Sequence, residues 1–289
     1  MNTSSRPVHI VTDSTADLTE ITIGDLPVTV VPLSVDINGT VYRDAVDLTR
    51  EEFVTHIRKG AFPKTSQPSP GAFQEVYRPL LDAGYDIVSV HIARQLSGTF
   101  NSATQAASAV DDGRIWLIDS TTVSMGTGFQ AIEAAEMARD GRSAEEIHAF
   151  IEKRKHDQRL YATLETLEFL RKGGRIGRAA AMLGSALRLK PIVRVHDGAV
   201  EPVERVRTYR RALNRLAGIY EESQPFDRIA VLHLDASEEA EKLVKRVLEI
   251  QPDADVVTGN IGTVIGAYGG PGLVGFTGLV SSNNSVHTG

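Results

Sequence analysis

Short apolar runs alternate with segments of helical periodicity through the first half of the chain. Alternation of this kind predicts an α/β domain built on a mainly parallel sheet. Asn38-Gly39 is a two-residue hairpin signal, which places a small β insertion at about residues 30–48. The runs that predict strands are Val8 to Asp13, Val28 to Ile37, Ile87 to Ile92 and Arg114 to Asp119.

Capping boxes predict where two helices begin, because a hydroxyl and a carboxylate three residues apart satisfy each other's backbone amides. A third helix follows Pro70, and Pro79 inside it is expected to kink or shorten it. The two boxes are Thr49-Arg50-Glu51-Glu52 and Ser143-Ala144-Glu145-Glu146, which open helices over Glu51 to Lys59 and Glu145 to His156.

The pattern changes after Arg159 to a mixture of hairpin, helices and strands. With 289 residues the chain exceeds the usual size of one domain. We therefore predict an α/β domain over residues 1–158 and an α+β domain over residues 159–289. The second part is predicted to hold a strand at Leu160 to Thr163, helices at Glu165 to Lys172 and Ala179 to Leu189, a hairpin at Pro191 to Val206 turning at Asp197-Gly198, a helix at Tyr209 to Glu222, a strand at Arg228 to Leu234, a helix at Glu238 to Ile250, a strand at Asp255 to Thr258 and a glycine-rich end.

Composition narrows the function classes. No apolar run approaches the ~18 residues that cross a bilayer, and Met1 to Pro7 lacks the apolar core of a signal peptide. We expect a cytoplasmic protein without stable membrane insertion. The chain has no cysteine, and its eight histidines lack metal-ligand spacing, so we expect no metal and no thiol chemistry.

Charge is unevenly distributed along the chain. The net charge of −6 argues against a nucleic-acid partner, yet Glu165 to Arg215 holds twelve Lys and Arg against five Asp and Glu. Such a basic segment either docks a partner or is solvated helix surface.

Hydroxyl side chains cluster at two predicted helix starts. Thr65 and Ser66 precede a helix capped by Ser69, and Ser97 and Thr99 precede a helix from Asn101 to Val110. The unpaired amides of a helix start attract anions, so the two starts together predict a site for one oxygen-bearing group. The alternative is that all these hydroxyls are ordinary caps.

Catalytic motifs are weak. Asp13 after an apolar strand permits a phosphotransferase reading, but Thr15 stands where such enzymes have a second aspartate. No serine lies in a Gly-x-Ser-x-Gly elbow, and the glycine runs at residues 173–177 and 269–272 fit turns rather than nucleotide loops. His91 is either a ligand contact or a core residue. The residues favour binding over catalysis and nominate no catalytic residue.

The order of several motifs resembles the DegV family. The motifs occur in the family's order and span nearly the whole chain. They are Val11-Thr12-Asp13-Ser14-Thr15-Ala16-Asp17, Tyr42-Arg43-Asp44, Lys64-Thr65-Ser66-Gln67-Pro68-Ser69, Leu96-Ser97-Gly98-Thr99, Ile118-Asp119-Ser120, Gly173-Gly174-Arg175-Ile176, Lys190-Pro191-Ile192, Arg207-Thr208 and Gly270-Pro271-Gly272.

The resemblance implies a protein that binds one long-chain fatty acid between its two domains, without a cofactor. It further implies that a separate kinase subunit converts the bound acid into acyl phosphate for phospholipid synthesis. The carboxylate is implied to lie at Thr65, Ser66, Ser97 and Thr99, and Arg207 to dock the kinase. Tyr268 stands near the position of a family histidine and can donate through its phenol without carrying positive charge.

Two other functions stay open from the sequence. One is a fatty-acid carrier or sensor without a kinase. The other is the phosphotransferase acting through Asp13.

Overall fold

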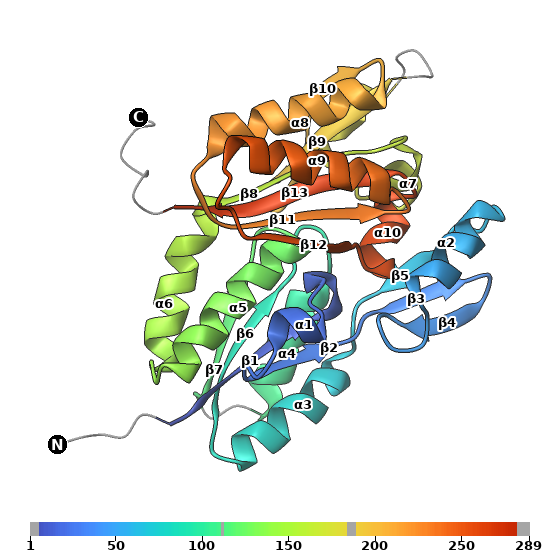
Figure 1. Ribbon diagram of the computed structural model, residues 1–289. Coiled ribbons are helices and arrows are strands. Elements are labelled where there is room, and N and C mark those ends of the chain that lie inside the picture. Colours follow the sequence, from blue (N-terminus) through green and yellow to red (C-terminus); the bar gives the residue numbers. More distant parts are fainter. Residues whose placement is uncertain (1–5, 111–112, 184–188, 282–289) are drawn as a thin grey trace.

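The computed structural model describes residues 6–110, 113–183 and 189–281. The first half forms a four-stranded sheet whose neighbouring strands are all parallel, as predicted from the alternating pattern (Figure 1). The carboxyl ends of parallel strands meet at one edge of their sheet, where open α/β sheets bind ligands. In spatial order the strands are β2 (Val28–Val31), β1 (Val8–Asp13), β6 (Asp86–His91) and β7 (Ile115–Asp119).

Helices cover both faces of this sheet. α3 (Pro70–Asp82) and α4 (Thr99–Val110) pack on one face, and α5 (Met125–Arg139) and α6 (Ala144–Arg154) on the other. α5 also contacts the second half of the molecule, so it is buried on most sides and lacks an apolar stripe that would reveal it in the sequence. α3 continues past Pro79, so the expected shortening there does not occur.

A small three-stranded sheet projects from the first half and includes the predicted Asn38-Gly39 hairpin. The run from Val28 to Ile37 is not one strand, contrary to expectation, because it divides at Pro32 between two sheets. Proline lacks the N–H that a ladder needs, which explains the break. The elements of this unit are β3 (Ser34–Ile37), β4 (Thr40–Arg43), α2 (Arg50–Arg58) and β5 (Lys64–Ser66), so the unit extends beyond the predicted residue 48.

The second half forms a six-stranded mixed sheet. Its strands are antiparallel to their neighbours except β11 and β12, which are parallel. The predicted Asp197-Gly198 hairpin is present, and both residues have positive φ. In spatial order the strands are β10 (Ala199–Val206), β9 (Lys190–His196), β8 (Gln158–Thr163), β13 (Leu273–Val280), β11 (Phe226–Leu234) and β12 (Val256–Asn260).

The glycine-rich end is more structured than predicted. It contains α10 (Thr263–Gly269) and the almost completely buried strand β13. The predicted helix from Ala179 begins as a short 3-10 segment, Gly177–Met182, and its residues 184–188 lie outside the described part of the chain. Further short elements are η1 (Ser14–Ala16), α1 (Glu20–Ile23), η2 (Lys155–Asp157) and α7 (Glu168–Lys172).

One of four clusters of buried apolar side chains in the described part of the chain spans both halves. α8 (Tyr209–Ser223) and α9 (Ser237–Ile250) cover one face of the six-stranded sheet, and the other face turns toward the first half (Figure 1). One cluster of buried side chains joins β3, α5 and this second face. All strands of the six-stranded sheet lie at or after Gln158, and we keep residue 158 as the proposed boundary. Among the described residues, no helix is long and apolar enough to span a membrane.

Candidate ligand-binding site

An apolar cavity lies between the carboxyl edge of the parallel sheet and the open face of the six-stranded sheet. The space not filled by protein atoms is ≈ 850 Å³, part of it open to solvent. Most of its wall is aliphatic, contributed by both halves of the chain. The aliphatic and small lining residues are Leu33, Ile92, Leu96, Val123, Leu160, Ala162, Leu164, Leu170, Val193, Val195, Val200, Val264, Ile265, Gly269 and Leu273.

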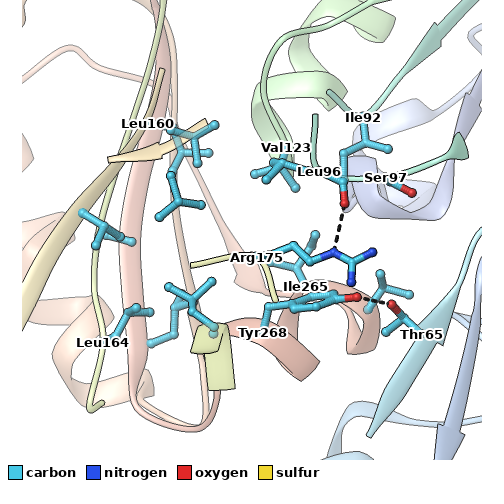
Figure 2. A pocket seen from close by; sticks show the side chains of 18 of the residues that line it. Thr65, Ile92, Leu96, Ser97, Val123, Leu160, Leu164, Arg175, Ile265 and Tyr268 are labelled. Atoms are coloured by element: carbon cyan, nitrogen blue, oxygen red, sulfur yellow. Dashed lines mark hydrogen bonds between the residues drawn. The ribbon is translucent and has the colours of Figure 1, made fainter. Parts of the chain in front are cut away.

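Polar side chains gather at one part of the wall. Figure 2 shows Thr65, Ser97, Arg175 and Tyr268 approaching one another from four separate segments. The Thr65 hydroxyl lies 2.5 Å from the Tyr268 phenol oxygen, although the two residues are 203 positions apart in sequence. An apolar cavity with a polar end fits an amphipathic ligand whose head group accepts hydrogen bonds.

Thr65 and Ser66 do not act together, in contrast to the sequence prediction. β5 is a strand that pairs with β3, and successive side chains of a strand point to opposite faces. Thr65 therefore lines the cavity, while Ser66 is exposed and does not line it. The sequence suggested a loop before a helix here, in which both hydroxyls were free to converge.

Ser97 and Thr99 have different roles at the second helix start. Ser97 lines the cavity, whereas Thr99 is completely buried behind it. The two hydroxyl oxygens lie 2.8 Å apart, and the Thr99 amide donates to the Ser97 oxygen over 3.3 Å. Thr99 therefore orients Ser97, and the structure does not bring Thr99 itself to the cavity.

Arg175 supplies a positive charge that the residue-based analysis missed. Its guanidinium lies 5.1 Å from the centre of the Tyr268 ring and donates to the carbonyls of Leu96 (3.2 Å) and Gly173 (2.9 Å) (Figure 2). Both acceptors are uncharged, and among the described side chains no carboxylate forms an ion pair with Arg175. The available signal was the Gly173-Gly174-Arg175-Ile176 motif, whose glycines suggested only a turn.

Gly173 of that motif makes room for Tyr268. A Cβ on Gly173 would lie 2.5 Å from the Tyr268 ring, closer than real contacts allow, and Gly174 has a φ of +73°. The Tyr268 ring thus packs against both the Gly173 backbone and the Arg175 guanidinium. This packing fixes the phenol oxygen beside Thr65.

Asp13 has no path to a substrate. Its side chain is completely buried and accepts hydrogen bonds from the amides of Thr15 and Ile92 and from the Thr15 hydroxyl. His91 Nδ1 lies 3.0 Å from Asp13 Oδ2, the oxygen that also accepts from the Ile92 amide. The hydrogen bonds continue from His91 through Ser89 to Tyr77, all of them buried. This network joins β1 and β6 to α3 inside the core. The hypothesis of a phosphotransferase that acts through Asp13 therefore has no support in the structure. His91 does not line the cavity.

Two buried aspartates hold the start of α10, the helix that carries Tyr268. Asp17 accepts from the Gly262 amide (2.8 Å), and Asp44 accepts from the amide and hydroxyl of Thr263 (3.2 and 2.6 Å). Burial raises the pKa of Asp17 to about 7, although bonds from Ser124 and Gly262 oppose the shift. Both aspartates belong to the first half of the chain, so α10 is anchored across the two halves. Within the described residues, no His, Cys, Asp and Glu side chains are grouped to hold a metal ion.

Comparison with known proteins gives the family. The family model described as "Uncharacterised protein, DegV family" matches residues 7–280. The chain belongs to the DegV family. The DegV domain-containing protein of Deinococcus radiodurans is 40% identical over 272 residues, which cover 93% of this chain and 96% of that protein.

Solved structures of DegV proteins share the fold. A DegV family protein from Thermus thermophilus, solved for its fatty acid binding, has a TM-score of 0.89 at 36% identity, covering 95% of this chain and 100% of that chain. A stearic-acid-binding protein from Eubacterium ventriosum has a TM-score of 0.87 at 29% identity, covering 93% and 97%. The family resemblance of the motifs and the predicted fold class are therefore confirmed.

Arg207 of this DegV family member lies away from the cavity. It is exposed at the end of β10, just before Thr208, which caps α8. It does not line the cavity, so any part it has in function concerns the outer surface.

Proposed function

We propose that the protein binds one long-chain fatty acid, with its tail in the apolar cavity and its carboxylate at Thr65, Ser97, Arg175 and Tyr268. The observation that carries this is an aliphatic wall joined to one polar cluster, whose cation, Arg175, forms no ion pair with any carboxylate of the described residues. The fatty-acid-binding relatives, which share the fold, support it.

The tail supplies most of the affinity in this arrangement. Burial of about fourteen methylenes at ~0.8 kcal/mol each contributes roughly 11 kcal/mol before the cost of ordering the chain. Hydrogen bonds to a carboxylate add only about 1.5 to 3 kcal/mol each. The head-group residues therefore set orientation, and the cavity wall sets the preferred chain.

We further propose that a separate kinase subunit phosphorylates the bound acid. In that step a carboxylate oxygen attacks the γ-phosphorus of ATP on the kinase, and ADP leaves. The polar cluster offers donors and a cation, and the described residues that line the cavity include no His, Asp or Glu to activate a hydroxyl as a nucleophile, which suits a protein that presents a substrate. The alternative is a carrier or sensor that binds the same acid without a kinase.

Lipid extraction and mass spectrometry of the purified protein test the binding. We expect one long-chain fatty acid per molecule, and much less in Val195→Trp, because Val195 lines the cavity on β9. His196→Trp is the matched control, since the next strand position is exposed and faces away. Wild-type protein that carries no lipid and takes up no added palmitate would refute the proposal.

A further inference from the structure

Gln67 is the remaining polar residue on the cavity wall. It follows Thr65 by two positions at the end of β5, and side chains two apart in an extended segment point to the same side. Thr65 is partly buried, whereas Gln67 is exposed. Gln67 therefore lies at the mouth of the cavity, beside the polar cluster.

The Gln67 amide packs against the start of α4. A Cβ built on Gly98 would lie 3.0 Å from the Gln67 Nε2 and 3.1 Å from its Cδ. Gly98 is not among the glycines with positive φ, so its backbone tolerates other residues. What the glycine provides at this position is space for the Gln67 amide.

The other donors of the cluster are already partly engaged. Thr65 and Tyr268 share one hydrogen bond, and Ser97 and Thr99 share another, so each pair leaves one hydroxyl proton for a ligand. A carboxylate has about four acceptor positions. A neutral amide with two N–H groups adds donors without adding a further charge that ligand binding would have to desolvate.

We propose that Gln67 is a further head-group residue: its Nε2 donates to the ligand carboxylate at the cavity mouth, and Gly98 leaves the space in which that amide lies. The inference rests on the proposed fatty-acid binding. It predicts that Gln67 distinguishes an acid from a neutral head group of the same chain length.

Calorimetry with palmitate and hexadecanol on delipidated protein tests this role. We expect Gln67→Ala to bind palmitate about tenfold more weakly, while hexadecanol binding changes less than twofold. The isosteric Gln67→Glu places a negative charge beside the carboxylate, and we expect a larger loss for palmitate at pH 8. An equal loss for both ligands would show a purely structural role and overturn the proposal.

A double-mutant cycle tests whether Gly98 provides the space for the Gln67 amide. Gly98→Ala is expected to weaken palmitate binding in the wild-type background and to have no added effect in Gln67→Ala, because the displaced group is then absent. Equal effects in both backgrounds, or wild-type affinity of Gln67→Ala, would refute the inference alone. Absence of palmitate binding by the wild type would instead refute the proposed function.

Discussion

Arg175 places a positive charge at the polar end of the cavity. From the sequence, the site was expected to contain only neutral donors, because Tyr268 stands near the position of the family histidine. The structure adds a guanidinium that stacks on Tyr268 and that, within the described part of the chain, donates its hydrogen bonds to carbonyls. The cation and the phenol thus form one unit, whose geometry depends on the small Gly173 beneath the ring.

Loss of this cation should weaken binding of acids. We expect Arg175→Gln to reduce palmitate affinity about fivefold, since the side chain is exposed and its charge partly screened. Arg178→Gln is the control, because Arg178 is exposed, pairs with Glu201 and does not line the cavity. Titration calorimetry measures both, and equal affinities of the two variants would remove Arg175 from the head-group site.

Three of the four residues of the polar cluster, Thr65, Ser97 and Tyr268, could be named from the sequence. Hydroxyls at helix starts drew attention to Thr65 and Ser97, and the structure joins Thr65 to Tyr268 across 203 positions. The sequence did not show that Ser66 faces away from the cavity while Thr65 faces it, because only the pairing of β5 with β3 shows that the segment is a strand. Arg175 was hidden because its position depends on the distant Tyr268 ring.

α10 connects the anchoring of the two halves to the head group. Asp17 and Asp44 hold its first residues, and Tyr268 is near its last. Because the folded-state pKa of Asp17 is about 7, the folded protein retains a proton that the unfolded chain loses above about pH 4. The free energy of unfolding therefore falls as pH rises from 4 to 7.

We expect this fall to reach up to about 4 kcal/mol and to disappear in Asp17→Asn. Asp47→Asn is the matched control: Arg43 lowers the pKa of Asp47 to about 2, so its titration lies below this pH range. Urea denaturation at several pH values gives the slopes. An unchanged slope in Asp17→Asn would show that Asp17 is ionised throughout.

The strand β13 was not predicted from the sequence because it contains glycines. β13 lies in the segment that was predicted only as a glycine-rich end. A Cβ on its Gly275 would lie 2.6 Å from the Tyr161 carbonyl, and one on its Gly278 would lie 2.7 Å from the Arg228 carbonyl. The glycines permit close strand pairing in the middle of a sheet. The two capping boxes were correct because a cap depends only on neighbouring residues.

At the scale of the whole molecule, neither half encloses the cavity alone. The parallel sheet contributes loops at its carboxyl edge, and the six-stranded sheet contributes an aliphatic face. Arg207 is exposed and does not line the cavity. A change at Arg207 can therefore be expected to leave ligand binding intact and to affect only a later step such as docking of a kinase.

That separation predicts the behaviour of Arg207→Ala. We expect unchanged palmitate affinity but severalfold slower acyl phosphate formation at limiting kinase subunit, because exposed charges mainly steer a partner. Arg246→Ala, an exposed arginine on α9, is the control. Unchanged turnover of Arg207→Ala would favour the carrier or sensor.

The orientation of the ligand is the central claim, and a crystal structure of the palmitate complex tests it most directly. The account predicts one palmitate in the cavity, its carboxylate within hydrogen-bond distance of Thr65 and Ser97 and beside Arg175, and its tail against the aliphatic wall formed by β8 and β9. A carboxylate at the opposite end of the cavity, or palmitate bound only outside it, would contradict the account.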